Sequence, residues 1–439
     1  MKDRFYIKTW GCQMNLHQSE AIAGILESAG YTQASSLQDA DIVLFNTCSV
    51  RQKAEEKVYG QFGQIKALKD QRDLVFGLGG CMAHIHRGKL LDRFPLIDFL
   101  FATTDLLSLP ALLSNAKKRK ARIVQIPSPS LVQEVPYSRQ SRVTAMVTIT
   151  EGCSNFCSYC IVPYARGPLR SRQPDLILSE VEDLADSGYK EICLLGQNVD
   201  SYGRDRPAYG DFADLLAAIA GTGIPRIRFT SSHPRDMTQR VIDTVADNPN
   251  VCNHIHLACQ SGSDRILAHM NRGYTSDDFL SIVKRARDTV PGINITTDLI
   301  VGYPGETRSD FGATMRLVRE AGFGSIFVAK YSPRPGTRSA EFEDDVPDSV
   351  KASRLQKVLE AQREIALSRN RESIGKTYSV LVEGRTQGRR LFGRADDHRT
   401  VTFAGNAKLG EFIQVRVDNA TAAALSGRTV TAATTRGAT

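Results

Sequence analysis

The segment that decides the fold is Cys153-Ser154-Asn155-Phe156-Cys157-Ser158-Tyr159-Cys160, which places three thiols within eight residues. Thiolates are the ligands of iron–sulfur clusters, and a cubane cluster takes four of them. Because no fourth cysteine lies nearby in the sequence, one iron would stay open to a substrate. The alternative is a structural zinc site, which takes four ligands, usually as two paired motifs. No second pair follows here, so the spacing favours an iron–sulfur cluster with an open iron.

The chain around this motif alternates regularly between strand and helix patterns from about residue 140 to residue 335. Short apolar runs predict six strands, with helical segments between them, at residues 145–150, 191–197, 226–232, 254–260, 294–302 and 324–332. Six βα units fit a partial (β/α)6 barrel, in which the chemistry lies at the carboxyl ends of the strands. The cysteine motif directly follows the first of these strands.

The two flanks of the barrel have different patterns. Before it, helical patterns at 17–29 and 51–68 alternate with apolar runs at 4–8, 41–47, 74–79 and 99–103, which predicts an N-terminal α/β domain with a parallel sheet. After it, a charged helix at about 347–370 leads into short strands at 376–384, 389–395, 399–404, 411–418 and 428–433. Their spacing predicts a small all-β barrel or sandwich.

These patterns divide the chain into an α/β domain, a linker, a barrel domain and an all-β domain. The linker is a basic run followed by a Pro- and Ser-rich stretch. We place the four parts at residues 3–119, 120–138, 139–370 and 371–435.

Composition limits the classes of protein to which the chain can belong. It has 439 residues, nine cysteines and a formal net charge of +8. No apolar run approaches the roughly 18 residues of a membrane span. The N-terminus lacks the apolar stretch of a signal peptide, so we expect a cytoplasmic protein with no membrane segment. Disulfides are not expected in that reducing compartment, so the cysteines point to a metal or redox role.

A second set of three thiols is spread over the N-terminal domain. Cys12, Cys48 and Cys81 each follow a predicted strand, and the ends of parallel strands meet at one edge of a sheet, where ligands bind. Gly11 and Gly80 leave room for a bulky group near the backbone. The alternative is three unrelated buried cysteines, since free cysteine is among the most buried residue types. Three thiols at equivalent positions favour a second cluster, again with an open iron.

The spacing of the central motif, with the aromatic Tyr159 before its last cysteine, resembles that of the radical S-adenosylmethionine (SAM) enzymes. The resemblance implies a 4Fe-4S cluster held by Cys153, Cys157 and Cys160, with SAM on the open iron. Tyr159 would pack near the adenine of SAM or form part of the core. In these enzymes the strand ends that match Gly196-Gln197-Asn198, Ser231-Ser232 and Val301-Gly302 contact SAM; the alternative is that these residues only cap the strands. The usual acidic residue is absent at 195–197, so the Gln197 amide would replace a carboxylate.

Nearly the whole chain, from residue 4 to about 434, resembles the methylthiotransferases of this superfamily. The supporting motifs include TWGCQMN, NTCSVR, GGCMA, EGCSNFCSYCIVPYARG, LLGQNVDSYG, RFTSSHP, MNRGYT, IVGYPGET and YSPRPGT, and they are most similar to the MiaB-type tRNA-modifying branch. The resemblance implies three domains: an N-terminal domain whose Cys12, Cys48 and Cys81 hold an auxiliary 4Fe-4S cluster, a radical SAM domain and a C-terminal TRAM domain.

The implied reaction is methylthiolation of C2 of isopentenylated adenosine at position 37 of tRNA. One SAM would supply the methyl group and a second the 5′-deoxyadenosyl radical. Because both clusters must face the adenine, we expect the edge of the N-terminal sheet to cap the mouth of the barrel. The implied partners are the tRNA anticodon loop and a reducing protein such as flavodoxin or ferredoxin, and we expect a monomer.

Basic residues provide a further indication of an RNA substrate. Residues 371–439 hold 11 Lys and Arg against 6 Asp and Glu, which is +5 of the net charge. Cations and aromatic rings lie close together there in the sequence: Arg385, Arg389, Arg390, Arg394 and Arg399, with Tyr378 and Phe392. Such a mixture is typical of surfaces that bind RNA. The alternative is an ordinary solvated basic face. After the cluster loop, Arg166, Arg170 and Arg172 would meet a carboxylate or an RNA phosphate, or form a solvated face.

Two alternatives keep the chemistry and change the substrate: threonylcarbamoyl-adenosine in tRNA, or a side chain of a ribosomal protein. The basic C-terminal domain argues against the second of these. An alternative of another class is a non-catalytic iron–sulfur protein that binds RNA. Three cysteines have no place in either cluster: we expect Cys193 in the core and assign no role to Cys252 and Cys259.

Overall fold

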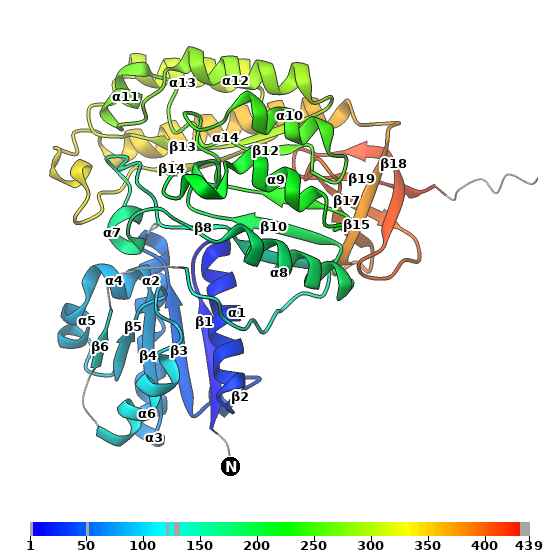
Figure 1. The fold of residues 1–439 in the computed structure, drawn as a ribbon. Coiled ribbons are helices and arrows are strands. Elements are labelled where there is room, and N and C mark those ends of the chain that lie inside the picture. The colour runs from blue at the N-terminus through cyan, green and yellow to red at the C-terminus, as the bar shows by residue number, and fades with distance from the viewer. Residues whose placement is uncertain (1–2, 50–51, 120–122, 127–131, 431–439) are drawn as a thin grey trace, which may run out of the picture.

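The structure, a computed structural model, describes residues 3–49, 52–119, 123–126 and 132–430 (Figure 1). The first unit is built on a six-stranded parallel sheet in the order β2-β1-β3-β4-β5-β6. Its strands are β1 (Arg4–Thr9), β2 (Thr32–Gln33), β3 (Ile42–Thr47), β4 (Val75–Gly80), β5 (Phe99–Phe101) and β6 (Ile123–Gln125). Because β6 pairs with β5, the sheet runs beyond residue 119 into the stretch expected to be a linker, and every residue of its central strand β3 is buried.

Helices cover both faces of this sheet. On one face α1 (Gln13–Ser28) and α6 (Leu109–Arg119) pack against apolar side chains such as Phe5 and Leu44. On the other face lie α2 (Gln52–Tyr59), α3 (Phe62–Gln71), α4 (Cys81–His86) and α5 (Gly88–Arg93). The single helix expected at 51–68 is therefore two helices, separated at Gly60 and Gln61, and Val58 of the first and Phe62 of the second both pack in the core.

The second unit is a six-stranded partial barrel with helices around it. Its strands form two parallel three-stranded sheets, β11-β10-β7 and β12-β13-β14, which isolated bridges join between β11 and β12. The strands are β7 (Thr144–Thr148), β10 (Glu191–Leu195), β11 (Ile227–Phe229), β12 (His254–His256), β13 (Asn294–Val301) and β14 (Ser325–Lys330). The helices are α7 (Val162–Arg166), α8 (Pro174–Asp186), α9 (Phe212–Ala220), α10 (Gln239–Asp247), α11 (Asp264–His269), α12 (Ser276–Thr289), α13 (Arg308–Ala321) and α14 (Asp348–Arg371).

Two of the barrel strands are shorter than the sequence predicts. The strands expected at 226–232 and 254–260 end at Phe229 and His256. Beyond those ends, Ser231 and Gln260 each take a left-handed φ of 69°, which interrupts the extended backbone. These irregular segments bring additional side chains to the mouth of the barrel. A small hairpin, β8 (Thr150–Glu151) with β9 (Arg170–Ser171), flanks the loop that carries the cysteine motif.

The third unit is a closed five-stranded barrel in the order β15-β16-β17-β19-β18. Its strands are β15 (Thr377–Arg385), β16 (Leu391–Arg394), β17 (Thr400–Ala404), β18 (Phe412–Ala420) and β19 (Leu425–Thr429). The last strand is earlier than the expected 428–433, of which 431–433 lie outside the described residues, because a tight turn at 421–424 follows the extended β18.

The two outer units contact different parts of the partial barrel. The C-terminal barrel covers the amino ends of its strands: Arg226 donates to the Arg394 carbonyl at 2.8 Å and Asn294 to the Asp397 carbonyl at 2.8 Å. The N-terminal unit packs α1 on β7 and α4 on α7, near the opposite ends of the strands (Figure 1). Within the described residues no helix is long and apolar enough to cross a membrane.

Candidate functional site

The three N-terminal thiols stand at the carboxyl ends of three neighbouring strands. Cys12 caps α1 just after β1, Cys48 follows β3, and Cys81 begins α4 directly after β4. Since β1, β3 and β4 are adjacent and parallel, their ends share one edge of the sheet. Cys48 and Cys81 are buried and Cys12 is exposed. The three cysteines therefore lie along one edge of the sheet, as the sequence predicts.

Two glycines make this close approach of the thiols feasible. Gly80 has φ 91° and ψ −167°, a conformation that is essentially restricted to glycine, and a Cβ there would lie 2.1 Å from the Thr47 carbonyl oxygen. A Cβ on Gly11 would lie 2.6 Å from Oδ1 of Asn15 and 3.0 Å from Cβ of Cys48. The ends of the three strands are therefore packed as closely as the backbone allows.

A pair of buried asparagines fixes the start of α1 against the end of β3. Asn46 donates to the Asn15 carbonyl at 2.8 Å, and Asn15 donates to the Thr47 carbonyl at 3.1 Å. The Cys12 thiol in turn donates to Oδ1 of Asn15 at 3.4 Å. These bonds set the position of Cys12 relative to Cys48.

The central cysteine motif is held in a loop whose hydrogen bonds go to distant segments. The Cys153 amide donates to the Gly167 carbonyl at 3.1 Å, and the Ser158 amide donates to the Met270 carbonyl at 3.0 Å. The Ser158 hydroxyl also bonds Tyr303 at 2.8 Å. The loop is thus shaped by the barrel before any cofactor binds.

The thiols of this motif are largely shielded from solvent. Burial raises the pKa of the Cys153 thiol and raises that of Cys160 to about 12. A bound metal ion compensates the charge of a coordinating thiolate and so favours its deprotonation. In the described residues no three His, Cys, Asp or Glu side chains come close enough to share one metal ion. A cluster places each thiolate on a different iron, so its ligands need not converge on a single point.

Both sets of cysteines line one chamber of about 640 Å³ between the N-terminal unit and the mouth of the barrel. The six thiols that line it are those of Cys12, Cys48, Cys81, Cys153, Cys157 and Cys160. The expectation that the edge of the N-terminal sheet caps the barrel mouth is therefore confirmed. Further lining comes from Trp10, Arg166, His233, Arg272 and Asp298.

Curated relatives with a named activity match almost the whole chain. It is 44% identical over 422 residues to the tRNA-2-methylthio-N(6)-dimethylallyladenosine synthase of Carboxydothermus hydrogenoformans, covering 94% of this chain and 96% of the relative. It is 45% identical to the Syntrophomonas wolfei protein of the same name, covering 97% of both chains. The chain belongs to this family.

Family models and solved structures agree with that membership. Residues 147–318 match the radical SAM superfamily, residues 4–102 the Uncharacterized protein family UPF0004, and residues 371–430 the TRAM domain. In fold, the chain is similar to the radical S-adenosylmethionine methyltransferase TsrM from Kitasatospora setae, with a TM-score of 0.58, 14% identity and coverage of 77% and 74%. It is also similar to the cobalamin-dependent SAM radical enzyme OxsB, with a TM-score of 0.51, 12% identity and coverage of 83% and 56%. As a radical SAM enzyme, the chain uses a 4Fe-4S cluster and SAM.

The positions predicted to contact SAM fall into two groups. Tyr159, Gly196, Gln197 and Ser232 line the chamber. Gln197 accepts a hydrogen bond from the Gly152 amide beside the cluster loop, and Ser232 donates to Asp200 at 3.0 Å. Tyr159 also packs against the buried cluster around Met270, so the adenine-side and core expectations both remain open.

Asn198 and Gly302 lie behind the chamber wall. Asn198 is buried and its amide donates to Asp236. Gly302 donates to Glu306 at 2.6 Å and its Cα lies against Lys351, where a Cβ would meet the Lys351 side chain at 2.3 Å. The structure thus separates these two residues from the four that reach the radical SAM chamber.

Arg272 is a site residue that the sequence prediction missed. It is buried, it lines the chamber, and its guanidinium donates to Sγ of Cys157 at 3.3 Å and to the Ala258 carbonyl. Arg272 lies in the MNRGYT motif, and the presence of a cation in a family motif is the feature of the sequence that could have identified it. Hydrogen bonds to cluster sulfurs adjust the reduction potential of a cluster.

The arginines that follow the cluster loop are buried, so the solvated basic face considered for them is wrong. Arg170 binds Glu151 at 2.9 Å, and Arg172 binds Glu134 and Glu180. Both therefore meet carboxylates, as one of the expectations had it. Arg166 instead lines the chamber beside the N-terminal thiols.

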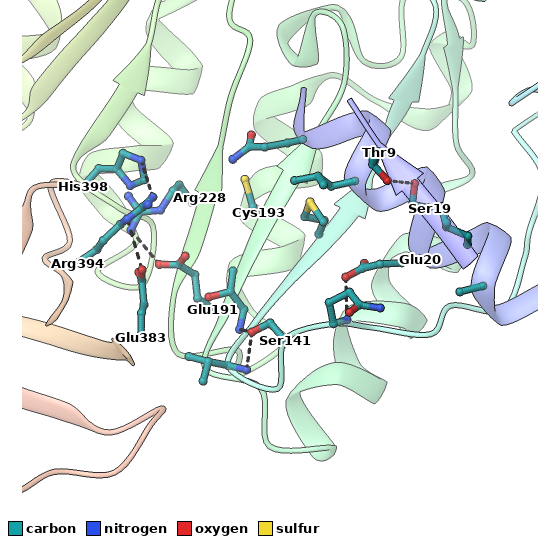
Figure 2. Close-up of a pocket in the computed structure, with 18 of the residues that line it drawn as sticks. Thr9, Ser19, Glu20, Ser141, Glu191, Cys193, Arg228, Glu383, Arg394 and His398 are labelled. Carbon is teal, nitrogen blue, oxygen red and sulfur yellow. Dashed lines mark hydrogen bonds and ion pairs between the residues drawn. The ribbon is translucent and has the colours of Figure 1, made fainter. Parts of the chain in front are cut away.

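A second cavity of about 630 Å³ lies where all three domains meet (Figure 2). Figure 2 shows the Glu191–Arg228 pair of the radical SAM domain facing Glu383, Arg394 and His398 of the TRAM domain. Gln13 lines both this cavity and the chamber. An apolar cluster stands between the two spaces: Met14, Met146, Cys193 and Leu195. Cys193 is buried as expected, and so are Cys252 and Cys259.

The basic residues of the TRAM domain divide into exposed and internally bonded groups. Arg385, Arg389 and Arg390 are exposed at the β15–β16 hairpin. The others bond within the protein: Arg394 to Glu383 and His398, Arg399 to Asp397 and Ser373, and Tyr378 to Ser373. Phe392 lines the second cavity. Arg385, Arg389 and Arg390 therefore offer exposed guanidinium groups to a polyanion.

Proposed function

We propose that this chain methylthiolates C2 of N6-isopentenyladenosine at position 37 of tRNA. The observation that carries the proposal is one chamber lined by two cysteine triads from different domains. The named relatives catalyse the synthesis of 2-methylthio-N6-dimethylallyladenosine in tRNA, as their names state. We further propose that the enzyme acts in the cytoplasm as a monomer, with its domains at 3–119, 139–370 and 371–435.

The residues present fit two clusters. Cys153, Cys157 and Cys160 would hold the SAM-binding cluster, and Cys12, Cys48 and Cys81 the auxiliary cluster. Each set offers three soft thiolate ligands, which leaves one iron for an exogenous ligand. Gly11 and Gly80 support the second assignment, because a side chain at Gly11 would clash with Asn15 and Cys48, and one at Gly80 with the Thr47 backbone next to Cys48.

The protein's own contribution is to position the reactants and to exclude water. The chemistry that such cofactors supply when bound is one-electron cleavage of SAM to a 5′-deoxyadenosyl radical, together with a sulfur and a methyl group for transfer. A C2–H bond of adenine is not acidic, so acid–base side chains alone offer no route to it. Closure of the barrel mouth by the N-terminal sheet shields a reactive radical from solvent. We propose that Tyr159, Gly196, Gln197 and Ser232 contact SAM, with Asn198 and Gly302 supporting them from behind.

An aromatic ring beside the chamber offers a surface for the substrate base. Phe327 on β14 is 55% exposed although it lies on the inner face of the partial barrel, in register with the chamber residue Asp298. Its ring lies 5.7 Å from that of His256, which bonds Asp298 at 3.2 Å. Exposed aromatic rings stack on unpaired bases, so we propose that Phe327 contacts an unstacked base of the anticodon loop. Arg385, Arg389 and Arg390 would bind the phosphate backbone nearby.

Reconstitution with iron and sulfide tests the proposal. The wild-type chain should bind about eight irons, the content of two cubanes. With SAM and a reducing protein such as flavodoxin or ferredoxin, it should release 5′-deoxyadenosine and methylthiolate isopentenylated RNA. Cys157→Ala should keep about four irons and release no 5′-deoxyadenosine. If the wild type binds the clusters and RNA but never cleaves SAM, the chain is instead a non-catalytic iron–sulfur protein that binds RNA.

The choice of substrate is tested separately. RNA carrying threonylcarbamoyl-adenosine and an isolated ribosomal protein serve as competing substrates in the same assay. We expect methylthiolation of the isopentenylated RNA alone. Product on either competitor and none on the isopentenylated RNA would transfer the proposal to that alternative.

A further inference from the structure

A buried cation of the radical SAM domain lies against the thiols of the other domain. Arg166, at the end of α7, is 4% exposed and lines the chamber. Its guanidinium lies near Cys81 and Cys12, and α7 packs on α4, the helix that begins at Cys81. Its Nη2 donates to the Gln18 side chain of α1 at 3.1 Å. Arg166 thus crosses the domain boundary and reaches two of the three thiols of the N-terminal triad.

The charge of Arg166 has no conventional partner. Within the described residues no carboxylate forms an ion pair with it; Glu151 acts on it electrostatically but is paired with Arg170. A buried cation is costly unless an anion compensates it. Metal-bound thiolates are anionic, so the loaded triad is an anion that this position fits.

The same loop connects Arg166 to the central cluster motif. The Cys153 amide donates to the carbonyl of Gly167, the residue that follows Arg166. Arg170 donates to the Arg166 carbonyl at 3.0 Å. Gly167 has φ 76°, and this left-handed turn separates the carbonyl that bonds Cys153 from the side chain that lies near the triad. One short segment therefore contacts both sets of cysteines.

We propose that Arg166 is a positioning residue for the auxiliary cluster, which it holds by charge-assisted hydrogen bonding to the thiolates of Cys81 and Cys12. This inference rests on the proposed function, because it requires a cluster on the N-terminal triad. A cation and N–H donors beside the cluster stabilise its reduced, more negative state and so raise its reduction potential. The residue also fixes the triad relative to the cluster on Cys153, Cys157 and Cys160.

Two other arginines, Arg172 and Arg334, differ from Arg166 in the groups that their guanidinium groups contact. Arg172 is equally buried on the same segment, but its guanidinium binds Glu134 and Glu180. Arg334 of the radical SAM domain interacts with Cys48, but also with two carboxylates, Glu55 and Glu56, whereas Arg166 interacts with two thiols and one carboxylate, Glu151. Arg172 is thus a matched control: a buried arginine whose removal breaks ion pairs without touching a thiol.

The test isolates the auxiliary cluster in the full-length chain. Cys153, Cys157 and Cys160 are replaced by alanine, so that about four irons are expected on the N-terminal triad alone. Arg166→Gln, Arg166→Lys and Arg172→Gln are then made in this parent. Iron content is measured after reconstitution, and the midpoint potential of the cluster by a redox titration followed by electron paramagnetic resonance.

We expect Arg166→Gln either to shift the midpoint potential of the auxiliary cluster to lower values or to lose its four irons. Arg166→Lys, which keeps the charge, should restore the iron and most of the potential, and Arg172→Gln should match the parent. Equal iron and potential in Arg166→Gln and the parent would overturn the inference, as would a loss in Arg166→Lys as complete as in Arg166→Gln. A parent without iron would instead refute the auxiliary cluster, and with it the proposed function.

Discussion

Replacing Gly80 by alanine should remove one cluster and leave the other. Gly80 directly precedes Cys81, and its φ and ψ lie in a region that costs a non-glycine residue about 1–3 kcal/mol. The new Cβ would lie 2.1 Å from the Thr47 carbonyl oxygen, whereas ordinary contact begins at 3.4 Å, so β3 and β4 must separate locally by about 1.3 Å. Overpacking of this kind costs a further 1–3 kcal/mol, roughly.

The displacement matters more for the cluster than for the fold. Metal–ligand distances are kept within about 0.2 Å, so a shift of more than 1 Å takes Cys81 away from its iron. We therefore expect Gly80→Ala to lose about 2–6 kcal/mol of stability in the N-terminal domain. It should bind about four irons where the wild type binds about eight.

The assay is iron and sulfide content per chain after reconstitution, with release of 5′-deoxyadenosine as the measure of the remaining cluster. Gly63→Ala is the control, because Gly63 lies within α3 and a Cβ there meets nothing within 4 Å. That control should keep about eight irons and gain up to about 1 kcal/mol of stability. If Gly80→Ala binds as much iron as Gly63→Ala and still methylthiolates RNA, the proposed packing of the triad is refuted.

Three further predictions concern the substrate and the chamber wall. Phe327→Ala should raise the KM for isopentenylated RNA several-fold with little change in SAM cleavage, while Phe327→Tyr retains binding; an equal KM in all three proteins would contradict base stacking. Replacing Arg385, Arg389 and Arg390 by glutamine should lower the slope of log Kd for RNA against log salt by about 2–3, measured by fluorescence anisotropy. Burial raises the pKa of Asp200 from 3.8 to about 7, so the folded protein holds this proton more tightly and the contribution of Asp200 to stability falls as pH rises between those values. The Tm of the wild type relative to Asp200→Asn should therefore fall between about pH 4 and pH 7, and parallel curves would contradict that burial.

Much of the fold follows from patterns that local physics enforces. Alternating apolar runs predicted the parallel sheet and the six barrel strands, because each strand must bury its side chains against helices. The N-terminal cysteine triad was found for the same reason, because parallel strands bring their carboxyl ends to one edge, and the central triad was found from its spacing in the sequence. The prediction that the edge of the N-terminal sheet faces the mouth of the barrel came from the chemistry that the family resemblance implies.

What the sequence did not reveal depends on contacts between distant segments. Arg166 and Arg172 differ by six positions and look alike in sequence, yet one faces thiols and the other carboxylates from two different segments. The position of Gly302 behind the wall depends on Lys351, which approaches from α14. The early ends of β11 and β12 arise from left-handed residues that carry side chains, and no residue-type pattern marks them.

The central claim is that the two triads face one isopentenylated adenosine in a shared chamber. It is tested most directly by mass spectrometry of tRNA nucleosides from a strain in which the gene for this chain is deleted. The account predicts that 2-methylthio-N6-isopentenyladenosine disappears, that the unmethylthiolated nucleoside accumulates, and that the wild-type chain restores the product while Cys81→Ala and Cys157→Ala do not. Unchanged levels of the methylthiolated nucleoside in the deletion strain would contradict it.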